Sequence, residues 1–263
     1  MESQESFSDA ARSVRLDVRL PRHNGDFDQD REFCSVLVDG TWRDIRFHDY
    51  AGIYRIPGLY EKLFHDILDC RSPDVVGKLL KEQIQRDGVA PSSLRVLDLG
   101  AGNGLVGEQM RTVGADHLVG VDITPEAGTA VERDRPGTYD AYYVTDVTDP
   151  PREVADALAG ARLNTMSCVA ALGYDDIPPS AFRAAFNLIG DGGWIAFTIK
   201  DRFLSADDTS GFAALISACE REHVLTVRSS EHYRHRLDVA GNPLHYVAIV
   251  GTKERDIPID LLP

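Results

Sequence analysis

Short apolar runs alternate with helix-spaced segments along the chain from residue 94 onward. The apolar runs cover residues 94–100, 117–123, 141–147, 164–172 and 192–199. Between them, apolar residues recur at helical spacing in segments 104–113, 125–133, 151–159 and 178–190. Continuously apolar strands joined by helices are typical of a parallel sheet that is covered on both faces. The pattern therefore predicts an α/β fold.

The end of the chain has a different pattern. A further helical segment at 210–222 precedes two longer alternating segments, 224–238 and 243–254, which are joined by residues 239–242. Alternation on both sides of a short polar connection predicts an antiparallel hairpin. We therefore expect a seven-stranded, mostly parallel sheet whose last strand is antiparallel, with helices on both faces.

The first part of the chain does not follow the strand–helix alternation. Residues 1–32 are charged and irregular, and residues 33–47 alternate around Asp39-Gly40, a dipeptide that favours hairpin turns. Residues 49–87 have helical spacing, with a break near Ser72-Pro73. These patterns predict an N-terminal arm, hairpin and helical cap over 1–72 and a ligand-binding core over 73–263.

Charge and cysteine content exclude several classes of protein. The chain has 42 acidic and 28 basic residues, a formal net charge of −14, whereas nucleic-acid binders cluster Lys and Arg. The four cysteines form no CxxC pair, which favours reduced thiols in a cytoplasmic protein. No apolar run reaches the 18 residues of a membrane span. We expect no nucleic-acid partner and no membrane partner.

A glycine-rich turn follows the first apolar run. Asp98 lies near the end of that run, and Gly100, Gly102 and Gly104 precede a predicted helix that begins at Leu105. Glycine adopts positive φ and lets the backbone approach a ligand closely, while the helix start offers free N–H groups. This context predicts a ligand-binding turn.

Two cofactors compete for this turn. Gly102-x-Gly104-x-x-Gly107 matches the dinucleotide fingerprint, so an NAD(P)-dependent oxidoreductase remains an alternative. A carboxylate at Asp98 would however face the two charges of a pyrophosphate. S-adenosylmethionine (SAM) carries no phosphate, and its ammonium and sulfonium are cationic. The acid therefore favours SAM, whose product would be S-adenosylhomocysteine.

Acids also end the next two predicted strands. Asp122, 18 residues after Gly104, is placed to accept hydrogen bonds from a ribose diol, and its alternative role is that of an acid at a helix N-terminus. Asp146 is placed to accept from an adenine amino group or, equally, to cap a turn. The cofactor site predicted from these strand ends also includes their neighbours Ala101, Ile123 and Val147.

The motifs DLGAGNG, GVDIT and VTD at successive strand ends resemble the class I SAM-dependent methyltransferases. The resemblance covers about residues 73–253 and implies a Rossmann-like fold. It implies that the methionine end of SAM lies along Asp98, Gly100, Gly102 and Gly104, the ribose at Asp122 and the adenine at Asp146. The tyrosine-bearing N-terminal helix, GAGNGLVGE and a late SGF helix are also similar to the small methyltransferase-like 27 group.

Methyl transfer depends mainly on alignment, and a base is needed only when the acceptor holds its proton tightly. We predict transfer to an O or N atom of a small-molecule metabolite. Similar enzymes close N-terminal aromatics over SAM, a role for Tyr54, although helix-spaced aromatics also serve as packing residues. The segment 172–179 lacks the Asn/Asp-Pro-Pro-aromatic motif that grips planar amino groups. The predicted substrate residues are Tyr50, Tyr60, Leu172, Tyr174, Asp175, Lys200 and Tyr233.

Histidines near the end of the chain are candidate bases. His232 and His235 lie on a predicted strand, where alternation places Tyr233 with His235 on one face and His232 on the other. The two histidines therefore do not form a metal pair, and we predict no metal. A non-catalytic SAM-binding protein stays open as an alternative. The hairpin at 33–47 is a candidate contact for a homodimer, and equally for packing on its own domain.

Overall fold

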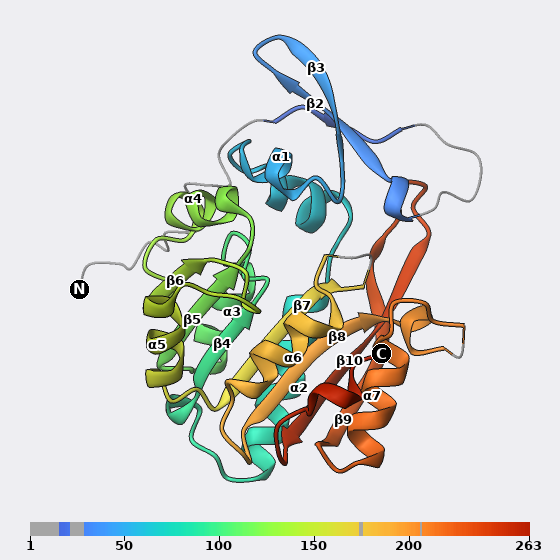
Figure 1. Cartoon of the computed structure of the whole chain (residues 1–263). Helices are drawn as coiled ribbons and strands as arrows, with labels where there is room; N and C mark the ends of the chain where they lie inside the picture. The colour runs from blue at the N-terminus through green and yellow to red at the C-terminus, as the bar shows by residue number, and fades with distance from the viewer. Residues whose placement is uncertain (1–15, 22–28, 174–175, 206) are drawn as a thin grey trace.

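The computed structural model describes residues 16–21, 29–173, 176–205 and 207–263, and its largest feature is a seven-stranded sheet with strand order β6-β5-β4-β7-β8-β10-β9 (Figure 1). The strands are β4 (Arg95–Leu99), β5 (His117–Asp122), β6 (Ala141–Val144), β7 (Thr165–Leu172), β8 (Trp194–Lys200), β9 (Leu225–Leu237) and β10 (Pro243–Lys253).

Only β10, the last strand along the chain, runs antiparallel to its neighbours in this sheet. Neighbouring strands from β6 to β8 pair in parallel, and β10 lies antiparallel between β8 and β9. This confirms the predicted seven-stranded, mostly parallel sheet with an antiparallel last strand. The chain enters at β4, moves outward to β6 and then crosses back to β7. Ligands of open α/β sheets bind where the strand order reverses in this way, here at the carboxyl ends of β4 and β7.

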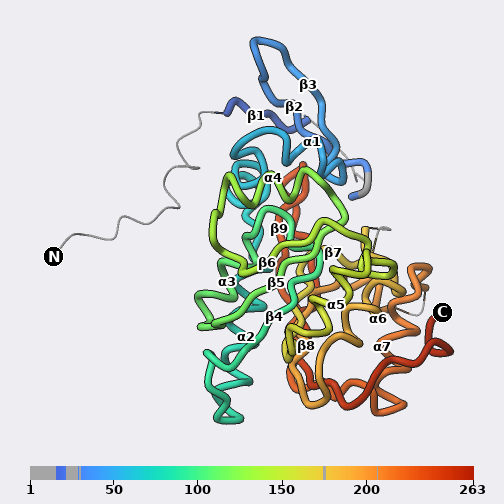
Figure 2. The backbone as a smooth tube through the Cα atoms, turned by 60° about the vertical axis from the view of Figure 1, so that its left-hand side comes forward, coloured from blue at the N-terminus to red at the C-terminus, as the bar shows by residue number. Residues whose placement is uncertain are grey.

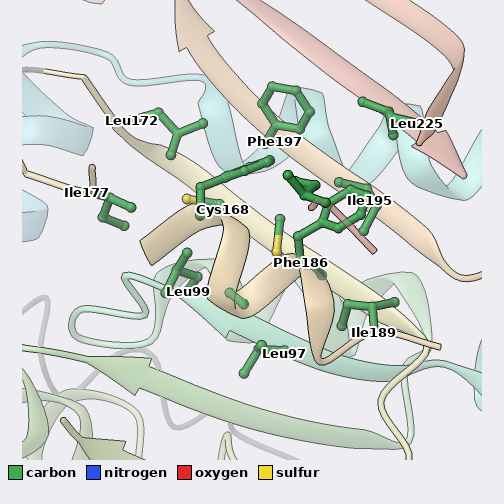
Figure 3. Close-up of a cluster of buried hydrophobic side chains, with 14 of the residues drawn as sticks. Leu97, Leu99, Cys168, Leu172, Ile177, Phe186, Ile189, Ile195, Phe197 and Leu225 are labelled. Atoms are coloured by element: carbon green, nitrogen blue, oxygen red, sulfur yellow. The ribbon is translucent and has the colours of Figure 1, made fainter. Parts of the chain in front are cut away.

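Helices cover both faces of the sheet, as the sequence predicted. They are α2 (Ser72–Arg86), α3 (Leu105–Val113), α4 (Pro125–Asp134), α5 (Arg152–Gly160), α6 (Pro179–Asn187) and α7 (Phe212–Arg221). Val96 packs in a cluster with residues of α2 and α3, whereas its neighbour Leu97 packs with Phe186 of α6 and with Phe197 (Figure 3). The alternation of side chains along β4 therefore supplies two separate cores.

A second, antiparallel sheet lies near the N-terminus and extends away from the large sheet (Figure 1). Its strands are β1 (Val18–Arg19), β2 (Phe33–Val38) and β3 (Thr41–Arg46). Asp39 and Gly40 join β2 to β3 with φ of +50° and +77°, which confirms the predicted hairpin turn. The short β1 was not predicted, because its two residues gain strand structure only through pairing with β2. A 3-10 turn (Gln29–Arg31) follows it in the described part of the arm.

The helical cap lies above the carboxyl ends of the parallel strands (Figures 1 and 2). It consists of α1 (Tyr50–Tyr54) and the π-helix η4 (Glu61–Ile67), and the predicted break precedes Ser72. The Asp49 side chain caps α1 by accepting from the Gly52 N–H at 3.0 Å. Cys34, Phe47, Ile53 and Leu63 form an apolar cluster within this part of the chain. Among the described residues, no helix has the length and apolar character needed to cross a membrane.

Candidate active site

A cleft of about 570 Å³ opens between the cap and the carboxyl ends of the parallel strands. The cap contributes residues 48–51 together with Tyr54 and Tyr60. The sheet contributes the ends of β4 and β5, the loop after β6, and the segment after β7 that leads into α6. The cleft therefore lies at the reversal of strand order, where the topology predicts a ligand site.

The glycine turn runs beneath the cap. Gly100, Gly102 and Gly104 have φ of +70°, +54° and +89°, which side-chain-bearing residues rarely adopt. A Cβ at Gly102 would collide with the Tyr54 hydroxyl, and one at Gly104 would lie 2.9 Å from Val131 Cγ2. Gly100 lines the cleft, whereas Ala101, Gly102 and Gly104 are outside its lining. The glycine turn therefore packs directly against Tyr54 of the cap.

Asp98 lies under this turn and outside the cleft lining. Tyr139 donates to its Oδ2 at 2.6 Å and Ser167 donates to its Oδ1 at 2.7 Å. Burial raises the pKa of Asp98 to about 6, although both hydrogen bonds oppose the shift. The sequence argument placed this carboxylate beside the ligand, directly or through water. In the structure both of its oxygens accept hydrogen bonds from within the fold, and the residue does not line the cleft.

Asp122 is placed as the sequence predicted, at the end of β5 and in the cleft lining. Its Oδ2 accepts from the Gly102 N–H at 2.9 Å, and its Oδ1 accepts from the Thr124 N–H at 2.8 Å. Burial raises the pKa of Asp122, and these backbone hydrogen bonds lower it. A carboxylate has about four acceptor sites, so this geometry leaves capacity for a ligand diol.

Ile123 and Val147 give the cleft an apolar patch beside Asp146. Ile123 is 64% exposed, which is unusual for a large apolar side chain within a cleft. Asp146 Oδ1 accepts from the N–H and the hydroxyl of Thr148, and these hydrogen bonds lower its pKa. Asp146 is therefore a turn acid, as one reading proposed, and it also lines the cleft. The patch and the acid fit the face and the edge of an adenine.

The three cap tyrosines line the cleft as a stacked row. The ring centroids of Tyr50 and Tyr54 are 6.2 Å apart, and those of Tyr54 and Tyr60 are 5.5 Å apart. Burial raises the pKa of all three hydroxyls, so they remain protonated and neutral. Arg133 of α4 donates to the Tyr54 carbonyl at 3.0 Å and ties α1 to the core. The tyrosines thus combine packing with exposure to the cleft.

The sequence analysis missed His48 and its pairing with Asp176. His48 Nδ1 lies 2.9 Å from Asp176 Oδ2, and both residues line the cleft. Their side chains are 22% and 24% exposed, so the pair is reachable but largely shielded. His48 follows the hairpin and Asp176 follows β7, and neither belongs to a motif. The adjacent predictions Tyr174 and Asp175 lie outside the described residues.

A second, smaller cavity of about 40 Å³ lies behind the cleft and is called the inner cavity below. Four of the predicted residues line it: Tyr50, Tyr60, Leu172 and His235. His235 Nδ1 is 2.6 Å from the Ser72 hydroxyl, and burial, aided by Arg236, holds the pKa of this imidazole well below its usual range. The full lining is Gln29, Phe47, His48, Tyr50, Tyr60, Phe64, Cys70, Ala170, Leu172, Asp176, His235, Arg236 and Tyr246.

The remaining predicted residues lie outside both linings. Tyr233 shares the Ser72 hydroxyl with His235, at 2.5 Å, as expected for two residues on one strand face. His232 is on the opposite, exposed face, stacked on His245 and 3.4 Å from Asp201. Lys200 donates to Gln29 Oε1 at 2.6 Å and so acts on the inner cavity through Gln29. In the described ranges, no three His, Cys, Asp or Glu side chains are arranged to hold a metal ion.

Comparison with known proteins assigns the class of this fold and site. Residues 64–242 match the family model described as "Methyltransferase domain", and the chain belongs to this family. The resemblance to class I SAM-dependent methyltransferases is thereby confirmed, and the family is not that of the alternative NAD(P)-dependent oxidoreductases. Gly107 has a packing reason instead, because a Cβ there would lie 2.5 Å from the Tyr139 ring.

Individual relatives are more distant. The chain is 30% identical to a ubiquinone biosynthesis O-methyltransferase of Bordetella avium over 61% of this chain and 63% of that protein. It is 32% identical to the enzyme of the same name from Paracidovorax citrulli over 44% of this chain and 48% of that one. The chain thus matches less than two thirds of the length of these curated relatives.

Solved structures show the fold. A SAM-dependent methyltransferase from Clostridium acetobutylicum superposes with a TM-score of 0.50 at 14% identity, covering 74% of this chain and 96% of that one. A putative RNA methyltransferase from Pyrococcus horikoshii gives 0.51 at 14% identity, covering 78% and 88%. At this identity the likeness concerns the sheet and its helices.

Proposed function

We propose that this protein transfers the methyl group of SAM to a hydroxyl oxygen of a small molecule. The observation that carries the proposal is the His48–Asp176 pair inside a cleft with cofactor-binding features. A hydroxyl must lose its proton during methyl transfer, whereas a neutral amine attacks without a base. The pair therefore favours oxygen over the nitrogen alternative. The relatives named as O-methyltransferases support the same choice.

The cleft fits SAM residue by residue. Asp122 would hold the ribose diol, Ile123 and Val147 the adenine faces, and Asp146 the adenine edge. Gly100 and the turn that follows it would lie along the methionine end. SAM supplies an electrophilic methyl group on its sulfonium, and S-adenosylhomocysteine would be its product. The Tyr54 hydroxyl packs where a side chain of residue 102 would lie, so glycine at this position lets the cap dock on the turn beside the cleft.

The chain's own residues do three things in this scheme. The stacked tyrosines at 50, 54 and 60 cover the cleft and exclude water, and their raised pKa values keep them from adding charge. Asp176 holds the Nδ1 proton of His48, which leaves the imidazole in the tautomer that accepts a proton at Nε2. His48 then takes the acceptor's hydroxyl proton, and Asp176 stabilises the resulting imidazolium.

Two broader assignments belong to the same proposal. One is the division into a cap over 1–72 and a cofactor-binding core over 73–263, which is supported by the position of the cleft between the described cap helices and the large sheet. The four free cysteines fit a reducing compartment such as the cytoplasm. The substrate of such a site is a small molecule that enters between the cap and the sheet.

A thermal-shift titration with SAM, S-adenosylhomocysteine and NADH tests the cofactor. A ligand at 100 times its dissociation constant adds about 2.7 kcal/mol, which raises the melting temperature by several degrees. We expect stabilisation by the two sulfur compounds and none by NADH. Labelled methyl transfer from SAM to hydroxylated acceptors tests the reaction. Binding of SAM without transfer to any acceptor would support a non-catalytic SAM-binding protein instead.

A further inference from the structure

Gly102 is the residue at which three other segments of the chain meet the glycine turn. Its N–H donates to Asp122 Oδ2 at 2.9 Å, and its carbonyl accepts from the Tyr142 hydroxyl at 2.7 Å. The Tyr54 hydroxyl of the cap lies where a side chain of residue 102 would begin. Both backbone hydrogen-bonding groups of Gly102 are therefore held by side chains, one from the end of β5 and one from β6.

Tyr142 reaches the turn from β6, the edge strand of the large sheet beside β5 (Figure 1). It lies outside the linings of the cleft and of the inner cavity, so its hydroxyl acts on the turn and not on a ligand. Burial, together with the carboxylates of Asp122 and Asp98, raises the pKa of this hydroxyl. The group therefore stays protonated at neutral pH and can donate to the Gly102 carbonyl.

Gly120 of β5 provides the space for the Tyr142 ring. The two residues are paired directly across β5 and β6, and a Cβ at Gly120 would lie 2.7 Å from Tyr142 Cδ2. A glycine inside a strand weakens the strand and often marks the close approach of another group. Here the approaching group is the Tyr142 ring, which lies over the glycine and extends its hydroxyl to the turn. The missing side chain at position 120 thus permits the hydrogen bond to Gly102.

The glycine turn needs such restraints because its backbone is intrinsically flexible. Gly100, Gly102 and Gly104 all have positive φ, and glycine loses more conformational freedom on folding than any other residue. If only the Gly102 N–H were held, the peptide unit that follows could rotate, and the turn would sample other conformations. Holding both groups keeps Gly102 in one conformation and keeps its partner Asp122 in one orientation. Such preorganisation favours ligand binding because less freedom is lost when the ligand arrives.

Tyr142 also packs against the cap. Its ring joins a small cluster that contains Tyr54 and Tyr60 of the cap and Ala127 of α4. The hydrogen bond from Tyr142 to Gly102 is partly buried, and a hydrogen bond shielded from water is stronger than an exposed one. Because the Tyr54 hydroxyl lies against Gly102 as well, the docked cap shields the contact that holds the turn.

From this geometry we propose that Tyr142 is a positioning residue for the cofactor, which fixes Gly102 and through it aims the Asp122 carboxylate at the ribose of SAM. Tyr142 acts through Gly102, since it lies outside the cleft lining. The proposal rests on the proposed function, in which Asp122 holds the ribose diol. It implies that the contribution of Tyr142 to cofactor affinity disappears when residue 122 is no longer a carboxylate.

The test is a double-mutant cycle on the binding of S-adenosylhomocysteine to the full chain, measured by calorimetry. Tyr142→Phe removes only the hydroxyl, and we expect the affinity to fall about 3- to 10-fold, the worth of one hydrogen bond. Tyr143→Phe is the matched control and should bind as the wild type does, because alternation places this next residue of β6 on the opposite face. In the Asp122→Asn background, Tyr142→Phe should change the affinity by no more than about twofold.

A merely structural role of Tyr142 would give a different result. General loosening of the fold would lower the affinity by the same factor whichever residue stands at position 122, and that outcome would overturn the proposal. The 2′-deoxy analogue of S-adenosylhomocysteine, which lacks one hydroxyl of the diol, gives a second readout. Tyr142→Phe should weaken its binding less than that of the parent compound, and equal losses would contradict the positioning role. If the wild type binds S-adenosylhomocysteine and Tyr142→Phe binds it equally well, only the positioning role fails, whereas a wild type that binds none removes the proposed function.

Discussion

His48 Nδ1 lies 2.9 Å from Asp176 Oδ2, although the two residues stand 128 positions apart in the chain. His48 belongs to the cap, and Asp176 belongs to the segment between β7 and α6. The pair therefore forms only when the cap is docked on the sheet. This couples the base to the same docking that covers the cleft.

Replacement of His48 should affect the chemical step and not cofactor binding. We expect His48→Asn to lower kcat by a factor of about 10² to 10⁴, the usual contribution of a general base, with the affinity for SAM nearly unchanged. Asp176→Asn should lower kcat less and change its pH profile. His65→Asn, at a half-exposed histidine on η4, is the control. Steady-state kinetics across pH checks this, and a fully active His48→Asn would remove His48 as the base.

Asp122 should contribute to cofactor affinity. Asp122→Asn replaces a carboxylate that lines the cleft with a neutral amide, and hydrogen bonds to charged groups are worth about 1.5–3 kcal/mol. We therefore expect the affinity for S-adenosylhomocysteine to fall by about 10- to 100-fold. Asp116→Asn, at an exposed position before β5, should bind normally. Calorimetric titration of S-adenosylhomocysteine into the wild type and the two variants measures these affinities. Equal affinities in all three would mean that Asp122 does not hold the ribose.

Two alanine variants distinguish the effect of the Gly102–Tyr54 contact from the effect of backbone strain at a positive φ. Gly102 and Gly137 both have positive φ, but a Cβ at 137 would meet nothing within 4 Å, whereas one at 102 would strike the Tyr54 hydroxyl. Gly137→Ala should cost about 1–2 kcal/mol of stability and leave binding intact. Gly102→Ala should lose a similar amount and also weaken binding of S-adenosylhomocysteine.

Removing the obstructing hydroxyl should restore binding in that variant. The double variant Gly102→Ala/Tyr54→Phe should regain most of the affinity lost in Gly102→Ala, because the phenylalanine ring leaves space for the added methyl group. Urea unfolding and calorimetry measure the two effects. A Gly102→Ala protein that binds as well as Gly137→Ala would show that the cap does not press on the turn.

Asp98 should make stability depend on pH. Its pKa of about 6 in the fold lies above the ordinary aspartate pKa of 3.8, so the folded state holds this proton more tightly than the unfolded chain. The ionised group therefore costs stability as the pH rises above 3.8, and the full cost is reached above about pH 6. Relative to wild type, Asp98→Asn should gain about 1 kcal/mol between about pH 5.5 and pH 8. Urea midpoints at both values check this, and a constant difference would contradict it.

The architecture of the core could be predicted because it depends on local patterns. Apolar runs and helical spacing located every strand of the large sheet and each α-helix described after Leu94. Asp122 was placed correctly for the same reason, since the end of a strand next to a glycine turn is a position that spacing defines. The Asp39-Gly40 turn followed from its own positive-φ preference.

Asp98 shows where this reasoning ended. Its place near the end of an apolar run was known from the sequence, but the contacts of its side chain depended on Tyr139 and Ser167, which donate to it from other segments of the chain. The spacing of motifs does not report such contacts between distant segments.

The sequence by itself determined the order and type of the strands and α-helices of the core, the glycine turn and the acids at the strand ends. Only the tertiary structure decided the His48–Asp176 pair, the inner cavity around Gln29 and Tyr246, and the burial of His235. The physical reason is the range of the interactions. Hydrophobic periodicity reports which face of its own element a residue occupies, whereas contacts between cap, β7 and β10 depend on how distant segments pack.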